Sequence, residues 1–182
     1  TSWMVLLLVQ ELLVAGRKIQ WHRTLGLAGF GLAVAMVVLG VLAATDALRR
    51  GADGGSGLGA LTFYAVPMTG IATFAVLVWF AYRARRQPAA HKRLILIATI
   101  AIAEAAVARW PIAALQADPP MRNWVMLAFL LLVAGYDLLS LRRVQKATLW
   151  GSVLVMVIML GQVPLGMTPW WHAFAAVMRG KG

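Results

Sequence analysis

The stretch TLGLAGFGLAVAMVVLGVLAA, residues 24–44, carries no charged side chain and decides how the rest of the chain is interpreted. A helix needs about 20 consecutive apolar residues to cross the roughly 30 Å hydrocarbon core of a bilayer. Comparable runs recur along the chain, and they predict six transmembrane helices over residues 2–15, 24–44, 61–82, 94–112, 124–139 and 148–165. The predicted fold class is an all-α membrane bundle, formed as a single membrane domain by residues 1–182.

The composition agrees with a chain that is almost wholly embedded in lipid. Hydrophobic residues make up 62% of the sequence, charged residues 13%, and the mean hydropathy is +0.79, values far from those of a soluble domain. The net charge of +11 is strongly basic. However, the cations lie in loops beside the apolar runs, so we predict no nucleic-acid partner. The absence of cysteine excludes thiolate metal sites and cysteine nucleophiles.

Basic residues are divided unevenly between the two ends of the predicted helices. Eleven lie in the loops at one end, and five, Lys181 included, lie in the loops and tail at the other. The positive-inside rule makes the first end cytoplasmic. Tryptophans such as Trp3 are expected at the membrane interfaces. We therefore predict a bacterial inner-membrane protein with both termini of this sequence on the outer side. The short first span suggests that further residues precede Thr1.

A short amphipathic segment follows the last predicted span. Thr168 is placed to cap a helix, and Pro169 suits its first position. We predict an interfacial helix over residues 169–178 on the outer membrane surface.

Small residues form stripes on two predicted spans. Gly29, Ala33 and Gly40 lie along residues 24–44, and Ala101 and Ala105 lie along residues 94–112. Small side chains let helix backbones approach closely in lipid. These two helices are therefore predicted to be central in the bundle.

Glu104 is the most unusual residue inside a predicted span. It lies about 15 Å along the helix from Leu94, near the bilayer midplane, where a carboxylate costs about 2.5 kcal/mol or more. Arg109 points about 140° away from it, so the two are poorly placed to pair. We expect Glu104 to face the protein interior, either as a proton or ligand site or as a protonated acid bonded to a neighbouring helix.

Glu11 and Asp137 lie one to two turns inside the predicted cytoplasmic boundary. We expect both carboxylates to be satisfied locally by the cations Arg17 and Arg142.

Two histidines form the only repeated motif of the sequence. His22-Arg23 opens one predicted span, and His91-Lys92-Arg93 opens another. Two imidazoles from facing helices, with arginines for the propionates, are the ligands that haem b needs. The alternative interpretation is that the cations at the helix entries contact anionic lipid headgroups or a protein partner. The residues predicted to make these contacts are Arg23, Lys92, Arg93, Arg142 and Arg143.

The segments His22-Arg23-x-x-Gly26 and His91-Lys92-Arg93-Leu94 resemble those of uncharacterised bacterial polytopic inner-membrane proteins. They are also distantly similar to b561-type cytochromes and to small membrane proteins associated with respiratory complexes. The likeness covers the second to fourth predicted spans. It implies bis-histidine haem and transmembrane electron transfer, usually through two haems. The chain departs from that pattern because its one histidine on the predicted outer side, His172, lies beyond the last span.

The sequence therefore predicts a non-catalytic accessory or scaffolding subunit that packs against a larger membrane complex and anionic lipid. No cofactor and no metal are expected. The alternative is a single-haem b electron-transfer protein with His22 and His91 as axial ligands. A secondary transporter with Glu104 as its coupling site is a third hypothesis.

Overall fold

The computed structural model describes residues 2–112, 115 and 119–180, and no strand occurs among them. The all-α class is confirmed. In chain order the helices are α1 (Ser2–Ala15), α2 (Ile19–Arg49), α3 (Ala60–Phe63), α4 (Ala65–Arg83), α5 (Pro88–Val107), α7 (Pro119–Leu141), α8 (Lys146–Gly166) and α9 (Pro169–Arg179). Lys181 and the expected extension before Thr1 lie outside the described residues.

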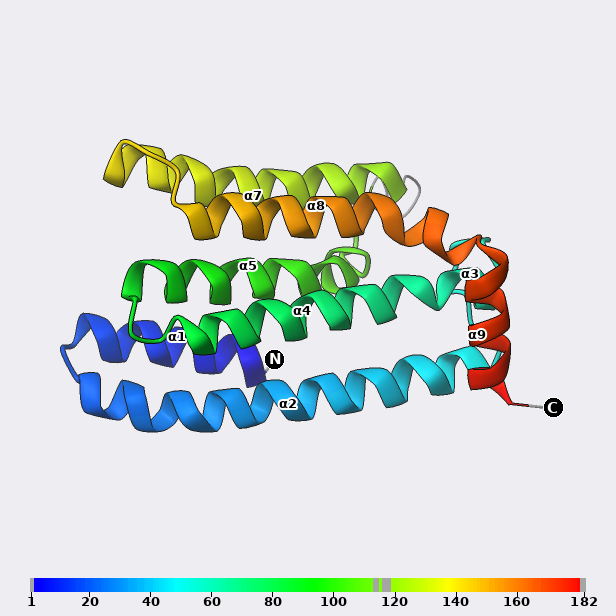
Figure 1. Cartoon of the computed structure of the whole chain (residues 1–182), viewed down its shortest axis with the longest axis horizontal. Helices are drawn as coiled ribbons and strands as arrows, with labels where there is room; N and C mark the ends of the chain where they lie inside the picture. The colour runs from blue at the N-terminus through cyan, green and yellow to red at the C-terminus, as the bar shows by residue number, and fades with distance from the viewer. Residues whose placement is uncertain (1, 113–114, 116–118, 181–182) are drawn as a thin grey trace.

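The long helices run side by side along the longest axis of the molecule, and α9 crosses their ends (Figure 1). The α1–α2, α4–α5 and α7–α8 turns gather at the opposite end. We call this the basic end, because its turns carry Arg17, Arg85 and Arg143. The other end is called the α9 end.

Among the described residues, four segments are long and apolar enough to cross a membrane, by length and composition: Ile19–Arg49, Ala60–Arg83, Met121–Leu141 and Lys146–Gly166. The prediction of six spans is therefore confirmed only in part. Helix α1 has 14 residues and reaches roughly 21 Å, which is short of the hydrocarbon core. Helix α5 includes Lys92, Arg93 and Glu104 among its 20 residues.

A proline explains why α5 is shorter than predicted. The helix ends at Val107, whereas the apolar run suggested residue 112. Pro111 lacks a backbone N–H, and its ring disfavours the helical conformation at Trp110. Glu104 consequently lies in the last turn of α5.

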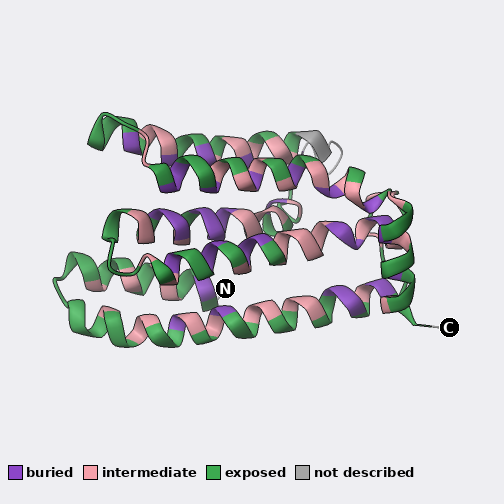
Figure 2. Ribbon diagram, viewed as in Figure 1, coloured by how far each residue is buried: buried purple, intermediate pink, exposed green. Residues whose placement is uncertain are grey.

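The centre of the bundle is formed by α4 and α5. Leu77 and Ala81 of α4 and Ile97 and Ala98 of α5 are completely buried. Both helices carry several of the buried positions that are purple in Figure 2. In the apolar 18-residue stretch of Ala60–Arg83, 39% of the residues are buried, whereas in the corresponding stretch of α2 17% are buried. The prediction that α2 is central was therefore wrong. Its outward side is a row of exposed apolar residues: Leu27, Val34, Val38 and Leu42.

The predicted small-residue stripe of α2 nevertheless contacts its neighbours. A Cβ added at Gly29 would lie 3.0 Å from Leu6 of α1, and one at Gly40 would lie 3.0 Å from Ile71 of α4. Ala33 is buried. In α5, Ala101 packs against the main core, but Ala105 is exposed, so its assignment to helix packing was wrong.

Trp3 lies in the interior, beside the middle of α4 and α5. Its indole Nε1 donates to Thr99 Oγ1 at 3.0 Å, and its ring meets Phe74 edge to face with centroids 5.3 Å apart. Only 6% of the residue is exposed. The prediction of an interfacial Trp3 was wrong because α1 begins partway along the bundle (Figure 1).

Helix α9 closes the α9 end through a second, smaller core. Trp171 and Ala175 are buried there against Leu48 of α2 and Tyr64 beside α3. The Trp171 indole donates to the carbonyl oxygen of Leu61 at 3.0 Å. Pro169 occupies the first turn as predicted. Thr168 occupies the N-cap position as predicted, but its hydroxyl donates to the preceding Leu165 carbonyl at 2.6 Å and makes no capping hydrogen bond to α9.

Candidate functional site

A buried ion pair joins α5 and α7 near the basic end. Arg93 Nη2 pairs with Asp137 Oδ1, and the two side chains are 5% and 0% exposed. Arg93 Nε donates to the same oxygen at 2.6 Å, and Nη1 donates to the carbonyl oxygen of Ala89 at 2.7 Å. The guanidinium is therefore held by both a counter-charge and the backbone of its own helix.

The second carboxylate oxygen of Asp137 is bonded from the start of α8. The Thr148 hydroxyl donates to it at 2.5 Å, and the Gln145 backbone N–H donates at 3.0 Å. One carboxylate thus connects α5, α7 and α8. A buried charge that is both paired and fully hydrogen-bonded is stable, whereas removal of its partner leaves a large desolvation penalty.

The structure corrects two sequence predictions at this site. Asp137 was expected to be satisfied by Arg142, which is exposed. Arg93 was expected to contact lipid or a partner, but it is turned inward with 4% of its surface exposed. Arg93 is turned inward because of its position on the helix: it precedes the buried Ile97 by four residues and Ile100 by seven, and therefore lies on the same face.

A similar signal could have placed Asp137 in the interior. Met126, Leu130 and Val133 are buried on α7, and Asp137 continues their helical spacing. Glu11, in contrast, is exposed. Among the ion pairs of the described residues there is none between Glu11 and Arg17.

The two histidines lie near enough to interact electrostatically at the basic end. His91 Nδ1 is 2.8 Å from the carbonyl oxygen of Ala81, so Nδ1 carries a proton, and in the neutral tautomer Nε2 keeps its lone pair. His22 contacts Gln10 of α1. The amide of Gln10 is oriented with its nitrogen toward His22. This nitrogen donates to His22 Nδ1 and, at 3.2 Å, to the His22 carbonyl oxygen. The ring proton of His22 is then on Nε2.

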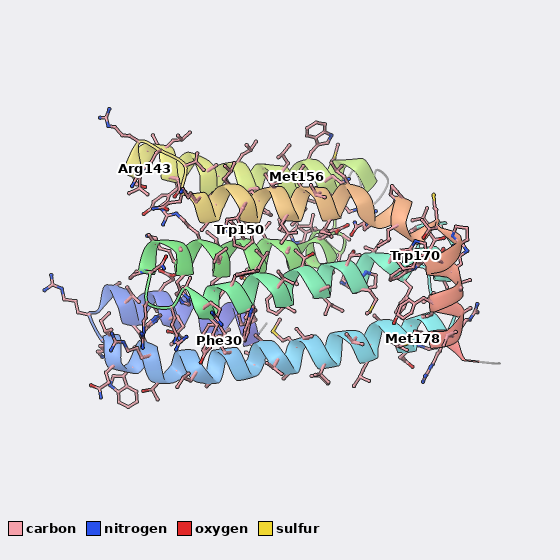
Figure 3. The ribbon with its side chains drawn as sticks, viewed as in Figure 1. Phe30, Arg143, Trp150, Met156, Trp170 and Met178 are labelled. Carbon is pink, nitrogen blue, oxygen red and sulfur yellow. The ribbon has the colours of Figure 1, made fainter. Side chains whose placement is uncertain are left out.

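Exposed cations lie at the same end of the bundle. Arg23, Lys92, Arg142 and Arg143 are all exposed at the basic end, where Figure 3 labels Arg143. Lys92 Nζ lies 5.6 Å from the centre of the Tyr136 ring. A cation over a ring keeps its charge available to solvent or headgroups while its stem covers apolar surface.

A second polar cluster lies toward the α9 end. Gln162 Nε2 of α8 is 3.4 Å from both carboxylate oxygens of Glu104. Gln162 Oε1 lies 3.4 Å from the Thr69 hydroxyl of α4, whose proton also has the Ala65 carbonyl oxygen as an acceptor at 2.7 Å. An adjoining cavity of about 20 Å³ is lined by Glu104, Gln162, Gly70 and Thr73 among others, and has room for about one water molecule.

The neighbour of Glu104 is therefore an amide of another helix. Arg109 Nη1 instead donates to the Ala105 carbonyl at 2.5 Å, and the described residues show no ion pair between Glu104 and Arg109. Gln162 is 6% exposed. Sequence reasoning did not single it out, although an amide inside an apolar run was a visible signal.

Glu104→Gln should change the free energy of unfolding by about 1 kcal/mol or less, because an amide can still bond to Gln162. Glu104→Lys should cost about 2.5–3.5 kcal/mol, because it forces a cation against a partly buried amide. Thermal unfolding in detergent micelles measures both, with Glu11→Lys at an exposed position as the control. If Glu104→Gln is as damaging as Glu104→Lys, the carboxylate is ionised, which would favour a proton or ion site.

Helix length, composition and these contacts together define the class of molecule: the described residues form an all-helical protein with four segments long and apolar enough to cross a membrane, whose buried polar groups connect helices. Comparisons with protein families, curated proteins and solved structures found no match to this chain.

Proposed function

We propose that this chain is a multi-pass bacterial inner-membrane protein that serves as a non-catalytic accessory or scaffolding subunit. In this role it packs against other membrane proteins and anionic lipid. One observation carries the proposal: the deeply buried charges are used to connect helices, as in Arg93–Asp137, whereas most of the exposed cations lie at the basic end.

In this proposal α1 and α5 lie in the bilayer with the other helices, giving six embedded segments. The ionisable residues of α5 are compatible with lipid surroundings. Lys92 lies near the basic end, Arg93 is neutralised by Asp137, and Glu104 is bonded by Gln162. Polar groups in a membrane interior are tolerated when they face a protein partner. The positive-inside rule places the basic end in the cytoplasm and the α9 end, with the C-terminus of this sequence, outside. The expected outer position of the N-terminus does not fit the structure, because α1 begins partway along the bundle.

The exposed cations give the basic end its proposed specificity. Each juxtamembrane Lys or Arg contributes about 1 kcal/mol toward an anionic leaflet. Arg23, Lys92, Arg142 and Arg143 together would therefore favour anionic lipid, or an acidic partner surface, by several kcal/mol. The exposed apolar row on α2 suits lipid tails or the helix of another subunit.

Replacing Arg23, Lys92, Arg142 and Arg143 with Gln tests the proposal. We expect the variant to co-purify with less anionic lipid and fewer membrane partners. The salt concentration that releases the remainder should be lower than for the wild type. The matched control removes four cations assigned to the other side: Arg49, Arg50, Arg122 and Arg179. Equal losses in the two variants would contradict the proposal, because total charge and not its position would then decide association.

A single haem b between His22 and His91 is the second candidate function. His91 favours it, because donation of Nδ1–H to a backbone carbonyl is typical of metal-ligating histidines. His22 does not fit, because the Gln10 contact places its proton on Nε2. A Soret band in the purified protein, lost on His22→Gln or His91→Gln, would replace the accessory role with electron transfer.

A further inference from the structure

A groove of about 540 Å³ opens at the basic end between α4, α5 and the start of α8. Its walls include Phe80, Arg83, Leu94, Gln145, Lys146 and Trp150. None of these side chains belongs to the proposed lipid-contact set, to the buried ion pair or to the Glu104 cluster. The groove is therefore a separate feature of the basic end.

The mouth of the groove is electropositive. Arg83 and Lys146 are both exposed, and no carboxylate occurs among the described residues that line the groove. Gln87 and Gln145 precede the first residues of α5 and α8, and neither side chain caps its helix. The N-terminus of α5 adds partial positive charge to that of the side chains, whereas the start of α8 is already bonded to the Asp137 carboxylate through the Gln145 N–H. The mouth thus complements an anion.

The part of the groove that lies further from the basic end is apolar. Arg83 ends α4 and Lys146 begins α8, whereas Phe80 and Trp150 lie about one helical turn further from the basic end. The two rings meet edge to face, with centroids 5.2 Å apart, and Figure 3 labels Trp150 on the side of α8 that faces α4 and α5. Leu94, at 3% exposed, is also apolar lining.

We propose that this groove binds one anionic phospholipid, with its phosphate between Arg83 and Lys146 and the start of an acyl chain along Phe80, Trp150 and Leu94. Cations at headgroup level above aromatic rings match the profile of a lipid at the membrane interface. A free phosphate ion would use the mouth and leave the aromatic wall unoccupied. This inference rests on the proposed function, since it requires the basic end to lie at the level of the headgroups.

Native mass spectrometry of the full chain in detergent tests this site, with phosphatidylglycerol, phosphatidylcholine and inorganic phosphate as separate additions. The double variant Arg83→Gln, Lys146→Gln should bind phosphatidylglycerol roughly thirty-fold more weakly. Trp150→Ala should weaken the same binding while leaving both charges in place. The matched control, Arg17→Gln with Lys18→Gln, removes one exposed arginine and one exposed lysine in the α1–α2 turn of the same end, outside both the groove and the proposed lipid-contact set, and should leave binding unchanged. Equal thermal midpoints for all variants exclude unfolding as the cause.

Two results would overturn the groove proposal by itself. One is an equal loss in the control variant, which would mean a diffuse charge effect. The other is efficient competition by inorganic phosphate with no effect of Trp150→Ala, which would mean an ion site without lipid. Failure of the proposed function looks different: the wild type would then show no preference for phosphatidylglycerol over phosphatidylcholine.

Discussion

Asp137→Ala should lower the free energy of unfolding by about 3–5 kcal/mol, one of the two largest effects expected for a single substitution in this chain. The substitution leaves the buried guanidinium of Arg93 without its counter-charge. It also removes the acceptor of the Thr148 hydroxyl and the Gln145 N–H. Thermal or denaturant unfolding in detergent micelles measures the loss.

An exposed ion pair provides the control for this prediction. Arg50 and Asp46 lie 2.8 Å apart with side chains 69% and 65% exposed, so Asp46→Ala should change stability by no more than about 0.5 kcal/mol. The double variant Arg93→Met, Asp137→Leu should recover most of the loss, because it removes both buried charges together. An effect of Asp137→Ala as small as that of Asp46→Ala would contradict the buried ion pair.

Trp3→Ala should cost about 3–5 kcal/mol, as is usual when a large buried aromatic side chain is truncated. The substitution removes the contact with Phe74 and the hydrogen bond to Thr99, which together fix α1 against α4 and α5. Trp3→Phe should keep the ring contact and lose about 1 kcal/mol for the hydrogen bond. Unfolding monitored by circular dichroism in micelles measures these differences.

Trp21 is the matched control, because it is a tryptophan at the basic end that is 68% exposed. Trp21→Ala should change the free energy of unfolding in micelles by about 0.5 kcal/mol or less. Equal effects at Trp3 and Trp21 would mean that Trp3 is an interfacial anchor, as the sequence alone suggested.

Helix positions could be predicted from the sequence because apolar run length is a local property. Helix α1 coincides with the predicted residues 2–15, and α9 extends one residue beyond the predicted 169–178. The end of α5 was missed because the hydrophobic run continues through Pro111, and hydropathy does not register the missing N–H. Proline chemistry, read first, would have ended that helix near Val107.

Partners of buried polar groups could not be predicted in the same way. The spacing of Met126, Leu130 and Val133 was enough to place Asp137 on a buried face, but it does not say which helix lies opposite. Arg93 is 44 residues away in sequence, and the pairing depends on how α5 packs against α7 and α8. The same limit applies to Glu104 and Gln162, which are 58 residues apart.

The histidine motif predicted the positions of His22 and His91 but not their hydrogen-bonding roles. The sequence predicted His22 and His91 at matching helix entries, and the structure does bring them near one another. Their different roles depend on Gln10 and on the carbonyl of Ala81. Neither group forms part of the repeated motif, so the tautomers could not be inferred from it.

Cysteine accessibility in intact cells tests most directly whether this chain is a membrane bundle with a cytoplasmic basic end. Ala52, in the loop between α2 and α3, and Gln87, between α4 and α5, are both exposed, and the chain has no other cysteine. A membrane-impermeant thiol reagent should label Ala52→Cys in intact cells, and should label Gln87→Cys only after permeabilisation. Labelling of Gln87→Cys but not Ala52→Cys in intact cells would contradict the proposed orientation, and equal labelling of both would contradict a membrane-spanning bundle.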